Sequence, residues 1–207
     1  MELIDQPHAP NPRRVNIFLA EKNIDLPNRR FLKIPEKEHL TPEIEALNPT
    51  RTLPILVLDD GTAISESVAI CRYFEETHPE PPLMGTNALE KAMIEMWQRR
   101  MEFNLLTPVA AAFRHSHPAM AELEVPQIKD WADVNKPRAL KGLEMLDAQL
   151  ATSKFVAGDT YSIADITALV GVDFTKAARI EVPESLGNLK RWYADVSSRP
   201  SAKAGIA

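Results

Sequence analysis

The sequence predicts an α/β unit in its first part and an all-helical unit in the rest. Three observations support this. The first eighty residues alternate short apolar runs with helical patterns, "PEPPLMG" at 79–85 interrupts them, and only helical stripes follow. The chain has 17 prolines but 7 glycines. Because proline fixes φ and lacks an N–H donor, these prolines mark boundaries between elements. We therefore expect domains at 1–80 and 87–207, joined by a linker at 79–86.

The first part is expected to have the order β-α-β-α-β-β-α. Pro12 suits the first position of a helix, where its missing N–H would have no partner in any case. Asp60-Gly61 is a strong hairpin signal between two apolar runs. The expected elements are strands at 2–5 and 28–34, helices at 12–22 and around 41–47, a hairpin at 53–64 and a third helix from Ser65.

The second part shows helical apolar spacing in three long stretches. The first contains Met93, Met96 and Trp97 and should kink or end near Pro108, which cannot continue a regular helix. Two further stripes run over 140–150 and 189–196. In "TYSIADITAL", Ser162 with Asp165 forms a capping-box pattern, which predicts the start of a buried helix.

Composition excludes several classes of protein. The net charge of −5 opposes binding to nucleic acid or to an anionic membrane, since both need a basic face. A single cysteine excludes an internal disulfide framework and any CxxC metal or redox motif, and we expect no metal site. The chain contains no run of eighteen apolar residues and no signal-peptide pattern. These features predict a soluble cytoplasmic protein.

Four segments, in this order, resemble the cytosolic glutathione S-transferase family: "NPTRTLPIL", "ISESVAICRYF", "SIADITAL" and "RWYADVSSRPS". The resemblance covers essentially the whole chain. It implies a thioredoxin-like N-terminal domain that binds glutathione and an all-α C-terminal domain, which together make the glutathione S-transferase fold. The loop "APNPRRV" is most similar to bacterial Nu-class members, which have Thr/Ser-Pro-Asn at this place.

The resemblance implies where glutathione binds. Leu53-Pro54 matches a cis peptide whose preceding residue pairs with the cysteinyl backbone of glutathione, whereas the residues alone favour an ordinary trans proline at an edge strand. Glu66 and Ser67 match the groups that hold the γ-glutamyl end. A helix start attracts anions, although the same residues also suit a plain polar helix start capped by Ser65.

Other parts of the implied site are less regular. His39 matches a position that contacts the glycyl carboxylate in some relatives, but an isolated loop histidine is often only solvated. Many relatives have lysine directly before the apolar-Pro pair, where this chain has Thr52; Arg51 is a possible substitute if its side chain points the same way. Relatives also form an electrophile pocket between their domains, and the matching residues here are Leu105, Val109 and Phe113.

The catalytic side chain is the main departure from the family pattern. Relatives stabilise the glutathione thiolate with Tyr, Ser or Cys near the first helix, but Ala9 stands where the hydroxyl would be. Asn11 remains, and its amide can donate a hydrogen bond to a thiolate; it can equally cap the helix. Of Arg13 and Arg14, at most one should face the site. Cys71 lies inside the third helix and is expected to be a packing residue.

The leading hypothesis is therefore an enzyme with glutathione as substrate, which adds the thiolate to electrophiles or exchanges it with small disulfides. The alternative is a non-catalytic binding or scaffold protein of the same fold. Ala9 favours the alternative, while retention of Glu66, Ser67 and Asn11 favours the enzyme. A homodimer is expected, with the third helix and the first long helix of the second part at its interface.

Overall fold

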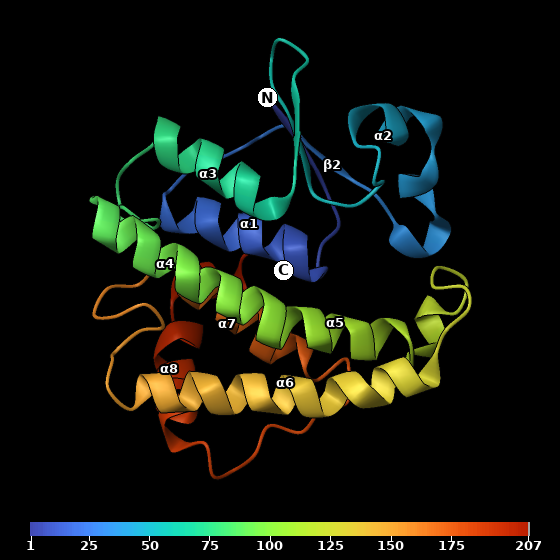
Figure 1. The fold of residues 1–207 in the computed structure, drawn as a ribbon. Helices are drawn as coiled ribbons and strands as arrows, with labels where there is room; N and C mark the ends of the chain where they lie inside the picture. The colour runs from blue at the N-terminus through green and yellow to red at the C-terminus, as the bar shows by residue number, and fades with distance from the viewer. Residues whose placement is uncertain (207) are drawn as a thin grey trace. The chain divides into compact units, whose positions relative to one another are not determined.

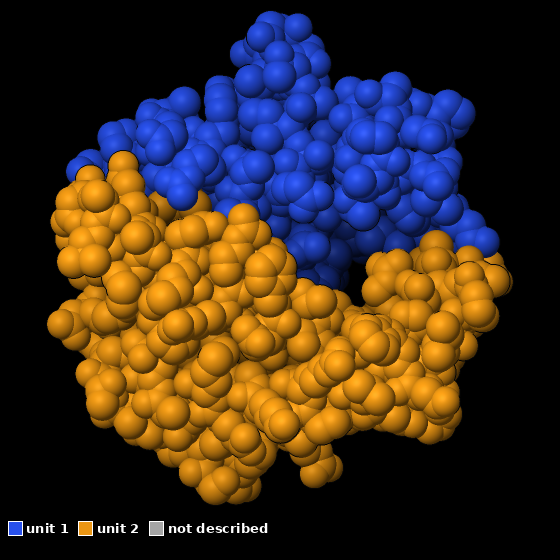
Figure 2. Space-filling model, in the orientation of Figure 1, with its two compact units in different colours: residues 1–82, 200–207 blue, residues 83–199 orange. Residues whose placement is uncertain are grey.

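The computed structural model describes residues 1–206, which form two compact units. Unit 1 comprises residues 1–82 and the C-terminal segment from Pro200, and unit 2 comprises residues 83–199 (Figure 2). The division between the two units falls after Pro82, within the proline-rich stretch at 79–85, and the segment from Pro200 groups with the first unit.

Unit 1 has the element order expected from the sequence (Figure 1). Its elements are β1 (Glu2–Asp5), α1 (Pro10–Glu21), β2 (Arg29–Phe31), the 3-10 turns η1 (Ile34–Glu36) and η2 (Glu38–Leu40), α2 (Pro42–Leu47), β3 (Ile55–Val57), β4 (Ala63–Ser65), α3 (Ser67–Thr77) and the C-terminal 3-10 turn η5 (Pro200–Lys203).

The four strands form one mixed sheet in the order β2-β1-β3-β4. β1 pairs in parallel with β2, and β3 pairs antiparallel with both β1 and β4. The hairpin between β3 and β4 turns at Gly61, which has a φ of +87°. Glycine reaches this conformation without the penalty that a side chain would add, as the Asp-Gly signal predicted.

Alternation along the central strands directs side chains to both faces of the sheet. Ile4 and Ile55 are paired across β1 and β3 and pack with Ile44 of α2. Leu3 and Leu56, the adjacent pair, point to the opposite face and are also fully buried. In Figure 1, α1 and α3 lie side by side, and α2 lies apart from them across the sheet.

The regular elements of unit 2 are all helices, joined by turns and by one isolated β-bridge between Phe155 and Gly158. Its elements are α4 (Ala88–Met101), the π-helical segment η3 (Glu102–Leu106), α5 (Thr107–Arg114), the 3-10 turn η4 (Pro118–Met120), α6 (Lys129–Leu150), α7 (Ile163–Phe174) and α8 (Gly187–Ser197). The kink or end expected near Pro108 is confirmed, because the α-helix gives way to π geometry just before it. None of the helices in residues 1–206 has the length and apolar character needed to cross a membrane.

Helix α7 forms the centre of unit 2. Every residue from Ile163 to Val172 is buried, so this helix is surrounded on all sides. Its start has the predicted capping box, in which the Ser162 side chain accepts from the helix backbone and Asp165 accepts from the Ser162 N–H. The Asp165 carboxylate also accepts from the Val156 N–H at 3.0 Å and from Trp192 Nε1 at 2.8 Å.

Two helix starts differ from expectation. α1 begins at Pro10 instead of Pro12, because the first turn of a helix tolerates proline at more than one position. α3 begins at Ser67, and Ser65 is the last residue of β4 instead of a helix cap. The expected strand at 28–34 is also shorter than its apolar pattern and ends at Phe31.

Candidate functional site

The first turn of α1 exposes Asn11. The N-cap residue is Ala9, and no side chain caps the helix, so the alternative in which Asn11 is the cap is wrong. Asn11 instead lies one position beyond Pro10 inside the helix, with an exposed side chain. His8, just before the helix, is exposed as well. The structure thus leaves the Asn11 amide accessible at the positive end of a helix.

The two arginines that follow point to different partners. Arg13 Nη2 donates to the Ala202 carbonyl at 3.1 Å, and this contact attaches the C-terminal segment to α1. Arg14 Nη1 donates to Ser67 Oγ at 3.0 Å. Of the pair, Arg14 is therefore the one with a hydrogen bond to the start of α3. Sequence reasoning did not find that Arg14 and Ser67 meet, because no local pattern links residues on separate helices.

The start of α3 combines a strained residue with an uncapped helix end. Glu66 is exposed and has a φ of +69°, a conformation that is unusual for a residue with a side chain. It is the N-cap residue, but no side chain caps the helix. The first N–H groups of α3 are thus left without a side-chain acceptor, an arrangement that suits a carboxylate ligand.

Ser67 is buried beside this helix end, with 5% of its surface exposed. A guanidinium can only donate hydrogen bonds, so Ser67 Oγ is the acceptor in its contact with Arg14. Within residues 1–206, no protein atom accepts the hydroxyl hydrogen of Ser67. The hydroxyl is therefore held in place by one contact and retains its own hydrogen for another.

The expected cis peptide is confirmed at Leu53-Pro54. In the part of the chain that the structure describes, the main-chain N–H and C=O of Leu53 have no hydrogen-bond partner. Regular pairing of this strand begins only at Ile55. Leu53 thus offers one donor and one acceptor on the same residue, which an extended peptide ligand can satisfy by strand-like pairing.

A buried asparagine organises the loop before Leu53. Asn48 is 1% exposed, and its Nδ2 donates to the Thr52 carbonyl at 2.9 Å. Its Oδ1 accepts from the Thr50 N–H and hydroxyl. The Asn-Pro pair was part of the family resemblance, but the role of Asn48 was missed. An asparagine followed by proline is a turn signal, and this signal could have identified it.

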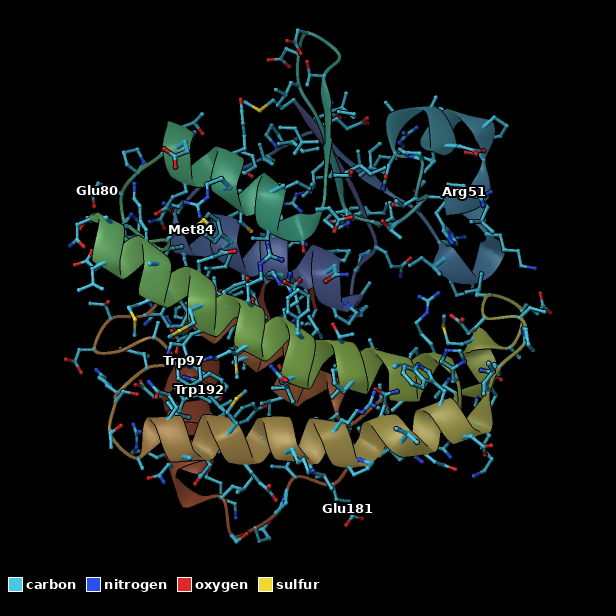
Figure 3. All side chains as sticks on the ribbon, in the orientation of Figure 1. Arg51, Glu80, Met84, Trp97, Glu181 and Trp192 are labelled. Carbon is cyan, nitrogen blue, oxygen red and sulfur yellow. The ribbon has the colours of Figure 1, made fainter. Side chains whose placement is uncertain are left out.

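The residues expected at the glycyl end lie in less constrained surroundings. Arg51, which is labelled in Figure 3, is exposed and has a positive φ of 52°. Thr52 is exposed too, and its hydroxyl contacts that of Thr50. His39 is half-buried in the η2 turn. The contact of any of these with the glycyl carboxylate stays a prediction.

Cys71 lies in the interior of α3 and is fully buried. Burial raises the pKa of its thiol to about 12, although the nearby positive charge of Arg14 acts to lower it. The thiolate is the reactive form of cysteine, so this thiol is inert at neutral pH. This finding agrees with the packing role expected from the sequence.

The residues expected to line an electrophile pocket belong to unit 2. Leu105 and Val109 have no exposed surface, and their contact with an electrophile stays a prediction. Sequence reasoning could not separate an inward from an outward apolar face here, because the π-helical turn before Pro108 changes the helical phase. Phe113 is half-buried and stacks on His117, with ring centroids 4.7 Å apart.

Comparison with known proteins identifies the family to which the two parts of the chain are similar. Residues 8–77 match the glutathione S-transferase N-terminal domain, and residues 105–200 match its C-terminal domain. The chain is 40% identical over 206 residues to glutathione S-transferase 2 of Saccharomyces cerevisiae, covering 98% of this chain and 88% of the yeast protein.

Solved structures agree as well. A glutathione S-transferase domain-containing protein from Marinobacter aquaeolei is 37% identical, with a TM-score of 0.93 and full coverage of both chains. A Gtt2-class glutathione S-transferase from Vibrio parahaemolyticus is 35% identical, with a TM-score of 0.86 over 99% of this chain and 96% of its own. The chain therefore belongs to the glutathione S-transferase family, whose members are transferases that take glutathione as substrate.

Proposed function

We propose that unit 1 binds reduced glutathione and presents its thiolate to electrophiles or small disulfides. The observation that carries this proposal is the start of α3. There the Ser67 hydroxyl keeps an unused hydrogen beside an uncapped helix end. The γ-glutamyl carboxylate would accept from both, and the exposed Glu66 would face the amino group.

Leu53 supplies the second anchor. Its unpaired main-chain N–H and C=O match the backbone of the cysteinyl residue, which has one acceptor and one donor of its own. Binding through main-chain atoms fixes the direction of the tripeptide without demanding a particular side chain. His39 is our candidate for the glycyl end, and Phe113 is the remaining candidate for contact with the electrophile.

Asn11 is our candidate for the group that stabilises the thiolate. The thiol must ionise before it attacks, and hydrogen bonds to the anion lower its pKa. The prolines on both sides of Asn11 restrict the backbone that carries it, which reduces the entropy lost when its side chain is fixed. The proposed reaction is addition of the sulfur to an electrophilic atom, or attack on a disulfide sulfur with release of a thiolate.

Binding is tested by titration calorimetry with the Glu66→Ala/Ser67→Ala variant. Each lost charge-assisted hydrogen bond costs about 1.5–3 kcal/mol, so the affinity for glutathione should fall by more than tenfold. Unchanged affinity in the double variant would sink the assignment. Turnover of a panel of electrophiles and disulfides by the wild type then separates the enzyme from a non-catalytic scaffold, which would bind glutathione without consuming either substrate.

We also propose that the protein is a cytoplasmic homodimer. α4 exposes Leu89 to 73% and Met93 to 39%, while Trp97 is buried, so the apolar stripe continues from the core onto the surface. Such a surface is suited to a partner subunit. Light scattering at micromolar protein should give twice the mass of the chain.

Membership of the Nu class, which the first loop led us to expect, stays a prediction. The similar solved structures include Gtt2-class members.

A further inference from the structure

We infer that Arg14 is a positioning residue that makes the start of α3 selective for a ligand with a free α-carboxylate. It does so by fixing the Ser67 hydroxyl as a hydrogen-bond donor and by placing positive charge beneath the helix end. The inference rests on the proposed function, in which that carboxylate is the γ-glutamyl end of glutathione. Arg14 itself need not touch the ligand.

The direction of the Arg14–Ser67 hydrogen bond is the first step. A serine hydroxyl can ordinarily donate or accept and can rotate between partners. Here Arg14 Nη1, 3.0 Å away, occupies a lone pair of Oγ. The hydroxyl hydrogen must then point away from the guanidinium. No atom of residues 1–206 receives it, so it is available to a ligand acceptor.

The difference between two ligand groups follows from this direction. A carboxylate accepts at both oxygens, so it can take the Ser67 hydrogen and an N–H of α3 together. A carboxamide of the same shape has one accepting oxygen, and its NH₂ group would meet a donor instead of an acceptor. Two donors that face each other in a buried site both lose a hydrogen bond that they make in water, and this free-energy cost makes the site prefer the carboxylate to the carboxamide.

Charge is the second step. Arg14 has 1% of its surface exposed, so its positive charge is poorly screened by water. The charge lies near the first turns of α3, where it acts on the Cys71 thiol one turn beyond Ser67, with Lys22 acting in the same sense and Glu75 in the opposite sense. It adds to the partial positive charge of the helix end. Both favour an anionic ligand over a neutral one.

The experiment compares two ligands with wild-type protein and with Arg14→Gln and Arg14→Lys. The ligands are glutathione and the analogue in which the γ-glutamyl α-carboxylate is a carboxamide. Calorimetry should show that the wild type prefers glutathione. In Arg14→Gln, affinity for glutathione should fall about tenfold while affinity for the carboxamide changes little, so that the preference shrinks. Arg14→Lys keeps the charge but loses the planar geometry, and its preference should be intermediate.

Lys22→Gln is the matched control. Lys22 is the C-cap residue of α1, is buried as Arg14 is, and forms an ion pair with Glu75 of α3 at 2.7 Å. Its loss should lower the melting temperature without changing the ratio of the two affinities. If the role of Arg14 were purely structural, Arg14→Gln would likewise lower the affinity for both ligands by the same factor. An unchanged ratio of the two affinities in Arg14→Gln would therefore overturn the inference.

A second arm uses the Ser67→Ala background. If Arg14 acts through the Ser67 hydroxyl, Arg14→Gln should reduce the preference for glutathione over the carboxamide much less once that hydroxyl has been removed. If the effects of the two substitutions on this preference simply add, Arg14 does not act through Ser67. Should circular dichroism show that Arg14→Gln does not fold, Arg14→Lys decides, and a wild-type ratio in that variant overturns the inference. Absence of glutathione binding by the wild type would instead overturn the proposed function, and the inference with it.

Discussion

At the scale of single residues, the Asn11 side chain is exposed and does not cap its own helix. Ala9 holds the N-cap position and has no side chain that can cap. Pro10 and Pro12 contribute no N–H groups to the first turn. Donors at this helix end are consequently few, and the exposed Asn11 amide gains importance among those that remain.

The Asn11→Asp variant tests this role. An aspartate in the first turn of a helix interacts favourably with the dipole, so the melting temperature should barely change. Its carboxylate would repel the glutathione thiolate, which should raise the pKa of the bound thiol by about one unit or more and reduce turnover. The ultraviolet absorbance of the thiolate, titrated against pH in both proteins, reports that pKa.

Asn28→Asp is a suitable control for Asn11→Asp. It makes the same change of charge at an exposed asparagine that lies just before β2. The Asn28 carbonyl accepts from the Leu3 N–H, near the beginning of β1, whereas α1 follows the end of β1. Matching titration curves for wild type and Asn11→Asp, with full activity, would leave the main-chain donors of α1 as the thiolate's partners.

At the scale of elements, the starts of α3 and α7 differ in whether a side chain caps their first N–H groups. α7 is closed by its own capping box, whereas α3 has no side-chain cap and keeps the Ser67 hydroxyl hydrogen available. α6 and α8 also lack a side-chain cap, so an open helix start alone does not indicate a site. The combination with Ser67 is what distinguishes α3.

The Asp165→Asn variant should destabilise unit 2 without a direct effect on glutathione binding. The carboxylate accepts from the Val156 and Ser162 N–H groups, the Ser162 hydroxyl and Trp192 Nε1. Burial raises the pKa of Asp165 to about 6, although the hydrogen bonds from these four donors act to lower it. The carboxylate therefore remains ionised at neutral pH. An asparagine NH₂ would face donors, at a cost of about 2–4 kcal/mol.

Urea unfolding at pH 7.5 measures this loss, which should appear as a lower transition midpoint. Asp159→Asn is the matched control, since Asp159 is exposed in the loop before the same helix. Its substitution should stay within about 0.5 kcal/mol of wild type. Equal midpoints for the two variants would show that the buried hydrogen bonds of Asp165 contribute no net stability.

At the scale of the whole molecule, the chain ends in the unit in which it begins. Ala202 accepts from Arg13, and the Gly205 carbonyl accepts from the His8 N–H at 2.8 Å. Gly205 has a φ of +76°, and a Cβ there would lie 3.2 Å from Arg13 Cα and from Asn16 Cβ. Close approach of the backbone to α1 therefore requires glycine at this position.

Gly205→Ala should lower stability by about 1–3 kcal/mol, because both the positive φ and the close contact oppose a side chain. Gly187→Ala provides the comparison, since no atom lies within 4 Å of the added Cβ and its backbone is not in the left-handed region. Thermal unfolding followed by circular dichroism should show a lower melting temperature for the first variant only. Equal melting temperatures would show that this contact contributes nothing.

The sequence by itself determined the features that depend on neighbouring residues. Apolar periodicity predicted the order of strands and helices, Asp60-Gly61 predicted the hairpin, and Ser162 with Asp165 predicted a helix start. Each of these rests on interactions within a few positions along the chain. Resemblance to a known family then predicted the cis peptide at Leu53-Pro54, which the structure contains.

Only the tertiary structure decided which distant residues meet. Arg14 and Ser67 are 53 positions apart, and Arg13 and Ala202 are 189 apart, so no local pattern could pair them. It also decided that Leu105 and Val109 point into the core. Hydrogen-bond direction and burial depend on packing between elements, and packing is a property of the folded chain as a whole, which periodicity does not report.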